Sequence, residues 1–335
     1  MSLLLLQLAL MLLVILVSAE LFTNALEQLG QRMGISEGVT GSLFAAVGTA
    51  LPETLVPVIA IVAGTQNVAI NQEIGVGAIL GAPLMLSTLS TCLMALSVLR
   101  LRGIGGRITP ERSGFLRDLH FFIAAFLLAA LAMYVPHGQV WLRGFIGVLL
   151  VLLYVIYVAL TLRASGTLVE AGHGTEADEP ILLTRLGLKQ NLGTILLQLV
   201  AALLLLVGGA KGFIYGVQGL SRVLGISALV LSLLIIPIAT ELPEKINSIL
   251  WARRGKDTLA FGNITGAMVF QGTLLPALGI MLTPWEPRPE VLSGIAITLI
   301  AAIWIRLNAG AQGPRVAALL ANGLLYLGYL AYTLL

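Results

Sequence analysis

Two glutamates, Glu53 and Glu244, stand directly after prolines inside long apolar stretches. A carboxylate at membrane depth costs at least ~2.5 kcal/mol, so it persists where it has a partner or a role. Each preceding proline frees the carbonyl four residues before it, at Gly48 and Ala239. A carbonyl oxygen beside a carboxylate suits Na⁺ or Ca²⁺. We therefore predict that both glutamates bind a cation; the alternative is a proline kink with a glutamate hydrogen-bonded to a neighbouring helix.

Four neutral polar residues are the next candidates for a cation site. Thr49 and Thr240 each precede one of the glutamates by four residues, which places them on the same helix face. Asn263 and Gln271 occur in a later apolar stretch, and amide oxygens are suitable cation ligands. We expect these four side chains to line or support the site.

Glu241 is a third carboxylate in an apolar stretch, and its spacing leaves two interpretations open. It lies four residues before Lys245, the favourable order for an ion pair within one helix. It also lies close to Glu244, so that it is equally a candidate cation ligand or proton carrier. Glu20 and Lys211 occupy equivalent positions of an internal repeat, and we expect them to pair with each other in preference to lining access paths.

The composition indicates that these residues belong to a membrane protein. The chain has 335 residues, of which 58% are hydrophobic and 10% charged, whereas a soluble domain carries about 25% charged residues. A spanning helix needs roughly 20 mostly apolar residues. Ten segments qualify, which predicts an all-α integral membrane protein that contacts the lipid bilayer and no nucleic acid. The segments are 3–28, 38–63, 75–99, 117–135, 140–162, 193–222, 227–250, 259–283, 290–307 and 314–334.

Basic residues predict the orientation of these spans. Of the 19 Lys and Arg residues, two (Lys211 and Lys245) lie within spans, 14 lie in the connections on one side and three in those on the other. Because connections rich in Lys and Arg stay in the cytoplasm, the first side is predicted to be cytoplasmic and both termini extracytoplasmic. We expect a multi-pass protein of the cell membrane, inner or plasma. The three residues on the outer side are Arg143, Arg222 and Arg288.

The sequence repeats itself around a hydrophilic connection at 163–192, which separates a five-span half at 1–162 from another at 193–335. Ser18–Glu53 aligns without a gap with Gly209–Glu244, and both stretches end in Thr-x-Leu-Pro-Glu. Similarity resumes at Gly75–Gly81 and Phe261–Gly266, where glycines four residues apart predict close helix packing. Five spans per half is an odd number, so the second half must enter the membrane from the opposite face. Inverted repeats of this kind form binding sites near the bilayer midplane.

At these motifs the chain resembles the membrane domain of sodium/calcium exchangers in the cation/calcium exchanger superfamily, as a divergent prokaryotic-type member. Each repeat of that family reads approximately G-T-S-L-P-E, then G-N-x-x-G-S-N-x-x-N/D. Here the first repeat is Gly48–Glu53 with Gly77–Leu86, and the second is Ala239–Glu244 with Gly262–Gln271. The resemblance implies ten helices in inverted repeats and a transported cation held by the two glutamates. It also implies that the site is lined or supported by Thr49, Thr240, Asn263 and Gln271.

The chain departs from the family pattern at several ligand positions. The serine expected after Thr49 is Ala50, and its counterpart in the second repeat is Glu241. The first repeat has thus lost most neutral oxygen ligands, whereas the second has gained a carboxylate, which suggests proton coupling or a different cation. The other replaced positions are Ala78, Ala82, Pro83, Leu86, Ala267 and Met268, and the terminal acid or amide is Gln271.

These observations together predict a secondary-active cation antiporter that exchanges Ca²⁺ for Na⁺ or H⁺ by alternating access at the paired glutamates. One alternative is a transporter of another ion or small solute that has lost the calcium site. The other is a membrane protein of the same fold without transport. The sequence holds no metal-hydrolase spacing, nucleophile motif or cofactor loop, so we expect neither an enzyme nor a bound cofactor.

Overall fold

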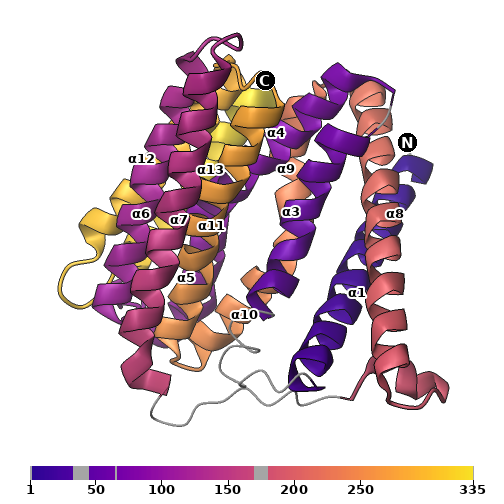
Figure 1. Cartoon of the computed structure of the whole chain (residues 1–335). Helices are drawn as coiled ribbons and strands as arrows, with labels where there is room; N and C mark the ends of the chain where they lie inside the picture. Colours follow the sequence, from indigo (N-terminus) through magenta and orange to yellow (C-terminus); the bar gives the residue numbers. More distant parts are fainter. Residues whose placement is uncertain (1, 33–44, 65, 170–179, 335) are drawn as a thin grey trace.

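The computed structural model describes residues 2–32, 45–64, 66–169 and 180–334, and these residues are almost entirely helical. Figure 1 shows the helices as a bundle in which most run roughly along one direction. The extended backbone contributes a single bridge between Arg107 and Arg315 within the described ranges. The expected all-α class is therefore confirmed for the described part of the chain.

The helices follow the expected apolar segments closely. Eight helices among the described residues are long and apolar enough to cross a bilayer, and shorter apolar helices at Pro52–Ala63 and Ala228–Ile238 occupy the two remaining expected spans. The helices are α1 (Ser2–Arg32), α3 (Ala45–Ala63), α4 (Val68–Met85), η2 (Leu86–Ser90), α5 (Thr91–Arg102), α6 (Arg112–Leu131), η3 (Ala132–Tyr134), α7 (Val140–Val169), η4 (Leu182–Leu186), α8 (Leu192–Leu224), α9 (Ala228–Thr240), α10 (Leu242–Arg253), α11 (Asp257–Leu282), α12 (Pro289–Asn308) and α13 (Val316–Leu334).

Two expected spans are interrupted. The segment expected at 227–250 is two helices, because α9 ends and α10 begins on either side of Glu241. Pro243 occupies one of the first two positions of α10, where the missing N–H of a proline costs no hydrogen bond. The segment expected at 75–99 extends over Val68–Arg102 and contains the π-helix η2 in its middle. Such interruptions occur frequently at functional sites, because they leave backbone groups for other partners.

Helices α1 and α8 run side by side along one flank of the molecule (Figure 1). A row of α8 glycines on one face receives apolar side chains of α1, as at Gly209 against Ile15 and Gly216 against Leu8. Asn24 and Gln198 join the two helices through a hydrogen bond of 2.9 Å. Glu20 and Lys211, which we expected to pair, are both exposed and form no ion pair within the described part of the chain.

Helix α4 packs closely against α9 through the predicted glycines. A Cβ atom at Gly77 would lie 2.6 Å from the Leu229 carbonyl oxygen, and one at Gly81 would collide with the Leu233 carbonyl. The packing role of this glycine pair is thereby confirmed. The second pair differs: of the described atoms, none would lie within 4 Å of a Cβ at Gly262.

Helix α11 is a central helix of the molecule, because it packs against α4, α6, α7 and α10. Its first residue, Asp257, receives two hydrogen bonds from Arg102 at the end of α5, of 2.6 and 2.7 Å. Arg143 at the start of α7 donates to carbonyls at the other end of α11, among them Ile280 and Thr283. Polar contacts with other helices thus hold both ends of α11.

Candidate cation-binding site

Glu53 is a buried carboxylate. It lies in α3 one residue after Pro52, and 5% of its surface is exposed. The Gln271 amide donates a hydrogen bond from Nε2 to Glu53 Oε1, with 3.3 Å between the two atoms. This contact joins α3 of the first half to α11 of the second, so two of the predicted ligands from different halves come together.

Gln271 presents its other amide atom as an acceptor. Its side chain is completely buried, and Oε1 has no hydrogen-bond partner among the described residues. Buried polar atoms are hydrogen-bonded in the great majority of cases, so an exception calls for an explanation. A hard cation beside Glu53 would supply the missing partner, because amide oxygens coordinate Na⁺ and Ca²⁺ readily.

Glu241 occupies the break between α9 and α10 and is completely buried. Its Oε2 lies 3.7 Å from Lys245 Nζ, and the Lys245 side chain is 6% exposed. The intrahelical ion pair, one of the two interpretations that the spacing allowed, therefore forms.

Thr240 and Asn263 lie on the helices that flank this break. The Thr240 hydroxyl donates to the Ile236 carbonyl of its own helix, at 3.1 Å, and keeps its lone pairs available as acceptors. The Asn263 amide donates to the hydroxyl of Ser248 at 2.9 Å, which links α11 to α10. Ser248 follows Lys245 by three residues, so Asn263 contacts the same face of α10 as the ion pair.

The side chains of Thr49 and Glu244 lie outside the residues that the structure describes. Their backbones belong to α3 and α10. Glu244 is the third residue of α10. The roles of Thr49 and Glu244 as ligands therefore stay predictions.

The replaced ligand positions of the first repeat form an apolar wall. Ala78, Ala82, Pro83 and Leu86 are all buried on α4 and at the start of η2. None of these side chains can offer an oxygen.

Two polar contacts near the site were missed by the sequence analysis. Asp118 of α6 is buried and accepts hydrogen bonds from Thr265 at 2.6 Å and from the Tyr157 hydroxyl at 3.1 Å. An acidic residue inside an apolar span was the available signal. The second is the contact of Lys245 Nζ with the Met85 sulfur at 2.9 Å, for which the sequence offers no signal because Met85 reads as an apolar core residue.

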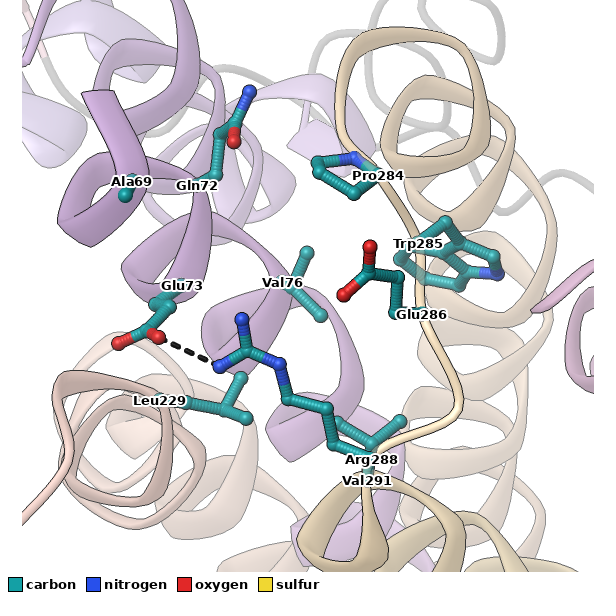
Figure 2. A pocket seen from close by; sticks show the side chains of 10 residues that line it. All are labelled: Ala69, Gln72, Glu73, Val76, Leu229, Pro284, Trp285, Glu286, Arg288 and Val291. Carbon is teal, nitrogen blue, oxygen red and sulfur yellow. Dashed lines mark hydrogen bonds and ion pairs between the residues drawn. The ribbon is translucent and has the colours of Figure 1, made fainter. Parts of the chain in front are cut away.

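A cavity of about 220 Å³ opens at one end of the α4–α9 pair (Figure 2). It is bounded by the first turns of α4, by Leu229 and by the segment that follows α11. Glu73 and Arg288 face each other across it and form an ion pair of 2.6 Å, and this contact raises the pKa of Arg288 above its ordinary value. The surrounding connections are those predicted to face outward, so the cavity lies at the expected outer mouth.

Comparison with known proteins places these features in context. The chain is 25% identical over 317 residues to the inner membrane protein YrbG of Escherichia coli, covering 93% of this chain and 91% of YrbG. It is 24% identical over 275 residues to the putative antiporter CaxA of Alkalimonas amylolytica, covering 80% and 77% of the two chains. The crystal structure of the H⁺/Ca²⁺ exchanger CAX superposes with a TM-score of 0.71 at 19% identity, covering 98% of this chain and 82% of CAX.

The CAX superposition shows a shared fold. The sequence itself matches the family described as sodium/calcium exchanger protein over residues 3–163 and 194–335. These two ranges contain every predicted site residue and both copies of the Thr-x-Leu-Pro-Glu motif. Together with its long apolar helices, the match identifies the chain as a multi-pass integral membrane protein that belongs to the sodium/calcium exchanger protein family.

Proposed function

We propose that this protein is a secondary-active cation antiporter that exchanges Ca²⁺ for Na⁺ or H⁺. The observation that carries the proposal is the buried Glu53 carboxylate, held by Gln271 from the opposite half of the chain. Membership of the exchanger family supports this reading. A carboxylate at this depth has a strong energetic reason to bind a cation or a proton, because leaving it charged and alone is costly.

The coupling of Ca²⁺ transport to the counter-ion follows from the ligands that the ions share. Ca²⁺, Na⁺ and H⁺ all bind carboxylates, so that one species must leave Glu53 and Glu244 before another binds. The Gln271 oxygen adds a neutral ligand to this pair, and Thr240 and Asn263 support it from α9 and α11. Exchange requires that the occupied site open to one face of the membrane at a time.

Two halves of inverted topology would let the site open to either face of the membrane. We propose ten spans in two five-helix repeats, 1–162 and 193–335, joined by the linker 163–192. The packing of α4 and α11, which are equivalent in the two repeats, supports inversion. The start of α11 lies beside the end of α5, through Arg102 and Asp257. Its other end lies beside the start of α4, where Arg288 meets Glu73. Helices α4 and α11 therefore run in opposite directions.

Calcium uptake into proteoliposomes tests the proposed function. Purified protein is reconstituted, and uptake is driven by a sodium gradient or by a pH gradient. Glu53→Gln should lower uptake by at least about a hundredfold, because a charged ligand is removed from a buried site at a cost of about 3 kcal/mol or more. Glu20→Gln is the matched control: it makes the same change at an exposed carboxylate of α1 and should leave uptake intact.

The gradient that drives uptake identifies the counter-ion. Uptake that survives Glu53→Gln would contradict the proposed site. Absence of calcium uptake by the wild type under both gradients would contradict calcium as the substrate. It would favour the second candidate, a transporter of another ion or solute, for which the apolar wall at Ala78, Ala82 and Leu86 is the supporting observation.

A further inference from the structure

Asp118 is a buried acidic residue that the proposed transport mechanism does not use. It lies in the second turn of α6, and 6% of its surface is exposed. Its hydrogen-bond partners are two hydroxyl groups from other helices. The Tyr157 hydroxyl of α7 lies 3.1 Å from Oδ1, and the Thr265 hydroxyl of α11 lies 2.6 Å from Oδ2. Asp118 forms no ion pair within the described part of the chain.

A neutral acid fits these surroundings better than a carboxylate does. Burial removes water from the charge, and a buried acid without an ion-pair partner takes up a proton in preference to staying charged. Aromatic rings pack around the group: Phe115 of α6 meets Phe261 of α11 edge-on, with 4.8 Å between the ring centroids. The ring of Phe121 lies 5.6 Å from that of Tyr157. The site is therefore apolar apart from the two hydroxyls.

The Thr265 hydroxyl indicates where a proton on Asp118 would lie. Its oxygen is 2.6 Å from Asp118 Oδ2 and 2.9 Å from the Phe261 carbonyl oxygen. A hydroxyl carries one proton, so it donates to one of these two atoms at a time. If Asp118 is protonated, the acid donates to Thr265, Thr265 donates to Phe261, and Tyr157 donates to Asp118. All three contacts are then hydrogen bonds, whereas a charged Asp118 leaves one of the Thr265 contacts without a proton.

The charged groups that act on Asp118 belong to its own helix. They are Arg117 and Glu111, which carry opposite charges. Helices α7 and α11 face Asp118 with the two hydroxyls described above. Helix α12 also packs against α6, and its Arg306 donates a hydrogen bond to His120. Neutralisation of Asp118 is therefore left mainly to a proton.

Asp118 contacts the helix that carries the candidate ligand Gln271. Thr265 precedes Gln271 by six residues, which is about 9 Å along the helix axis and about 120° around it. Thr265 accordingly faces α6, whereas Gln271 faces Glu53 of α3. The contacts of Asp118 and the candidate cation site thus lie on different faces of one helix.

We propose that Asp118, together with Tyr157 and Thr265, is a proton-binding site separate from the candidate cation site, through which α11 responds to pH. At neutral pH the acid is protonated, and its hydrogen bonds join α6, α7 and α11. In alkaline solution the proton leaves to the solvent, and the Thr265 hydroxyl turns from Phe261 to the Asp118 carboxylate. A buried charge then stands beside the helix of Gln271, so exchange changes with pH whichever ions are exchanged.

Infrared spectroscopy of the purified protein in detergent detects the proton directly. The C=O stretch of a buried carboxylic acid is separate from the carboxylate and amide bands, and it shifts in D₂O. The wild type at neutral pH should show such a band that Asp118→Asn lacks, and alkaline titration should remove it. Glu20→Gln changes an exposed carboxylate and should keep the band. Identical acid bands in the wild type and Asp118→Asn, at every pH at which both are folded, would overturn the proposal.

Two threonines of α11 provide a second test, which holds even where Asp118→Asn does not fold. Thr265 and Thr273 both donate to the carbonyl four residues earlier, and of the two Thr265 alone contacts Asp118. Thr265→Val removes the acceptor of the acid proton, so the acid band should move to higher frequency. Thr273→Val should leave the band in place. An acid band that stays at the wild-type frequency in Thr265→Val would overturn the proposed site.

The effect on exchange is measured with labelled calcium against unlabelled calcium in proteoliposomes, at equal pH on both sides. Each pH profile is normalised to its own value at neutral pH. The wild type should show an alkaline transition where the infrared band disappears, and Asp118→Asn should lose this transition. A transition that survives in Asp118→Asn would overturn the response to pH through this site. Absence of calcium exchange by the wild type would contradict the proposed function instead, and the infrared spectra would still decide the proton site.

Discussion

At the scale of single residues, the site contains two kinds of carboxylate. Glu53 accepts a hydrogen bond from the neutral amide of Gln271, and we propose that it binds the transported ion. Glu241 forms an ion pair with the Lys245 ammonium, with 3.7 Å between Oε2 and Nζ. Gln271 and Lys245 are therefore informative residues to replace.

Gln271 should determine how tightly the transported cation binds. Gln271→Leu removes the amide oxygen and the hydrogen bond to Glu53, so the KM for calcium should rise about tenfold, which corresponds to the loss of one hydrogen bond or ligand worth about 1.4 kcal/mol. The maximal rate should change less, because binding and not the conformational step is affected. Uptake kinetics in proteoliposomes measure both quantities.

Thr273→Val is a suitable control for this change. Thr273 is buried two residues further along α11, and its hydroxyl donates to the Val269 carbonyl of its own helix. The substitution therefore removes a buried polar atom of α11 without removing a candidate ligand. Equal KM values for Gln271→Leu and the wild type would rule out Gln271 as a ligand.

The sequence predicted several of these residue-level features because intramembrane polar residues are rare and so few partners are available to them. The ion pair of Glu241 with Lys245 follows from their spacing of four residues, and Gln271 was expected at the site because amide oxygens are suitable cation ligands. The contact of Asp118 with Thr265 was missed because it depends on which face of α6 meets α11, and no spacing within the chain determines that.

At the scale of elements, the interruptions of the helices matter more for the candidate site than the lengths of the helices. Apolar length predicts where α6, α8 and α12 lie to within a few residues, because the bilayer sets that length. The break at Glu241 and the π-helix η2 were not predicted. The π-helix η2 has a partner from another helix, because the Asn322 amide of α13 donates to its Ser87 carbonyl at 2.8 Å.

Arg143 should be a stability determinant of α11. Its guanidinium donates to the carbonyl oxygens of Ile280, Thr283 and Pro284, which the end of a helix leaves without partners of its own. Arg143→Met removes these hydrogen bonds and should lower the free energy of unfolding by about 2–4 kcal/mol, since bonds to charged groups contribute about 1.5–3 kcal/mol each and are not additive. Thermal unfolding in detergent measures the loss.

Arg163→Met provides the matched comparison for this variant, because Arg163 is an exposed residue of the same helix α7. An exposed position away from such contacts should change stability by no more than about 0.5 kcal/mol. Arg143→Lys keeps the charge but loses the planar fork, and its stability should fall between the wild type and Arg143→Met. A melting temperature for Arg143→Met equal to that of Arg163→Met would exclude the capping role.

At the scale of the whole molecule, α4 and α11, which the proposed repeat makes equivalent, pack in opposite directions. Contacts at both of their ends support this arrangement: Arg102 with Asp257 at one end, and Glu73 with Arg288 at the other. An antiparallel pair of equivalent helices is what an inverted repeat requires. The distribution of Lys and Arg residues agrees independently, because it assigns the two ends to opposite sides of the membrane.

Cysteine labelling tests this topology directly. In a Cys92→Ser background, which removes the chain's one native cysteine, Gln66→Cys and Lys256→Cys place a thiol at exposed positions just before α4 and α11. If the repeats are inverted, a membrane-impermeant maleimide added to intact cells labels Gln66→Cys from outside, whereas Lys256→Cys reacts only after the cells are opened. Labelling of both positions from the same side would exclude inverted repeats, and with them the alternating opening of one site to two faces.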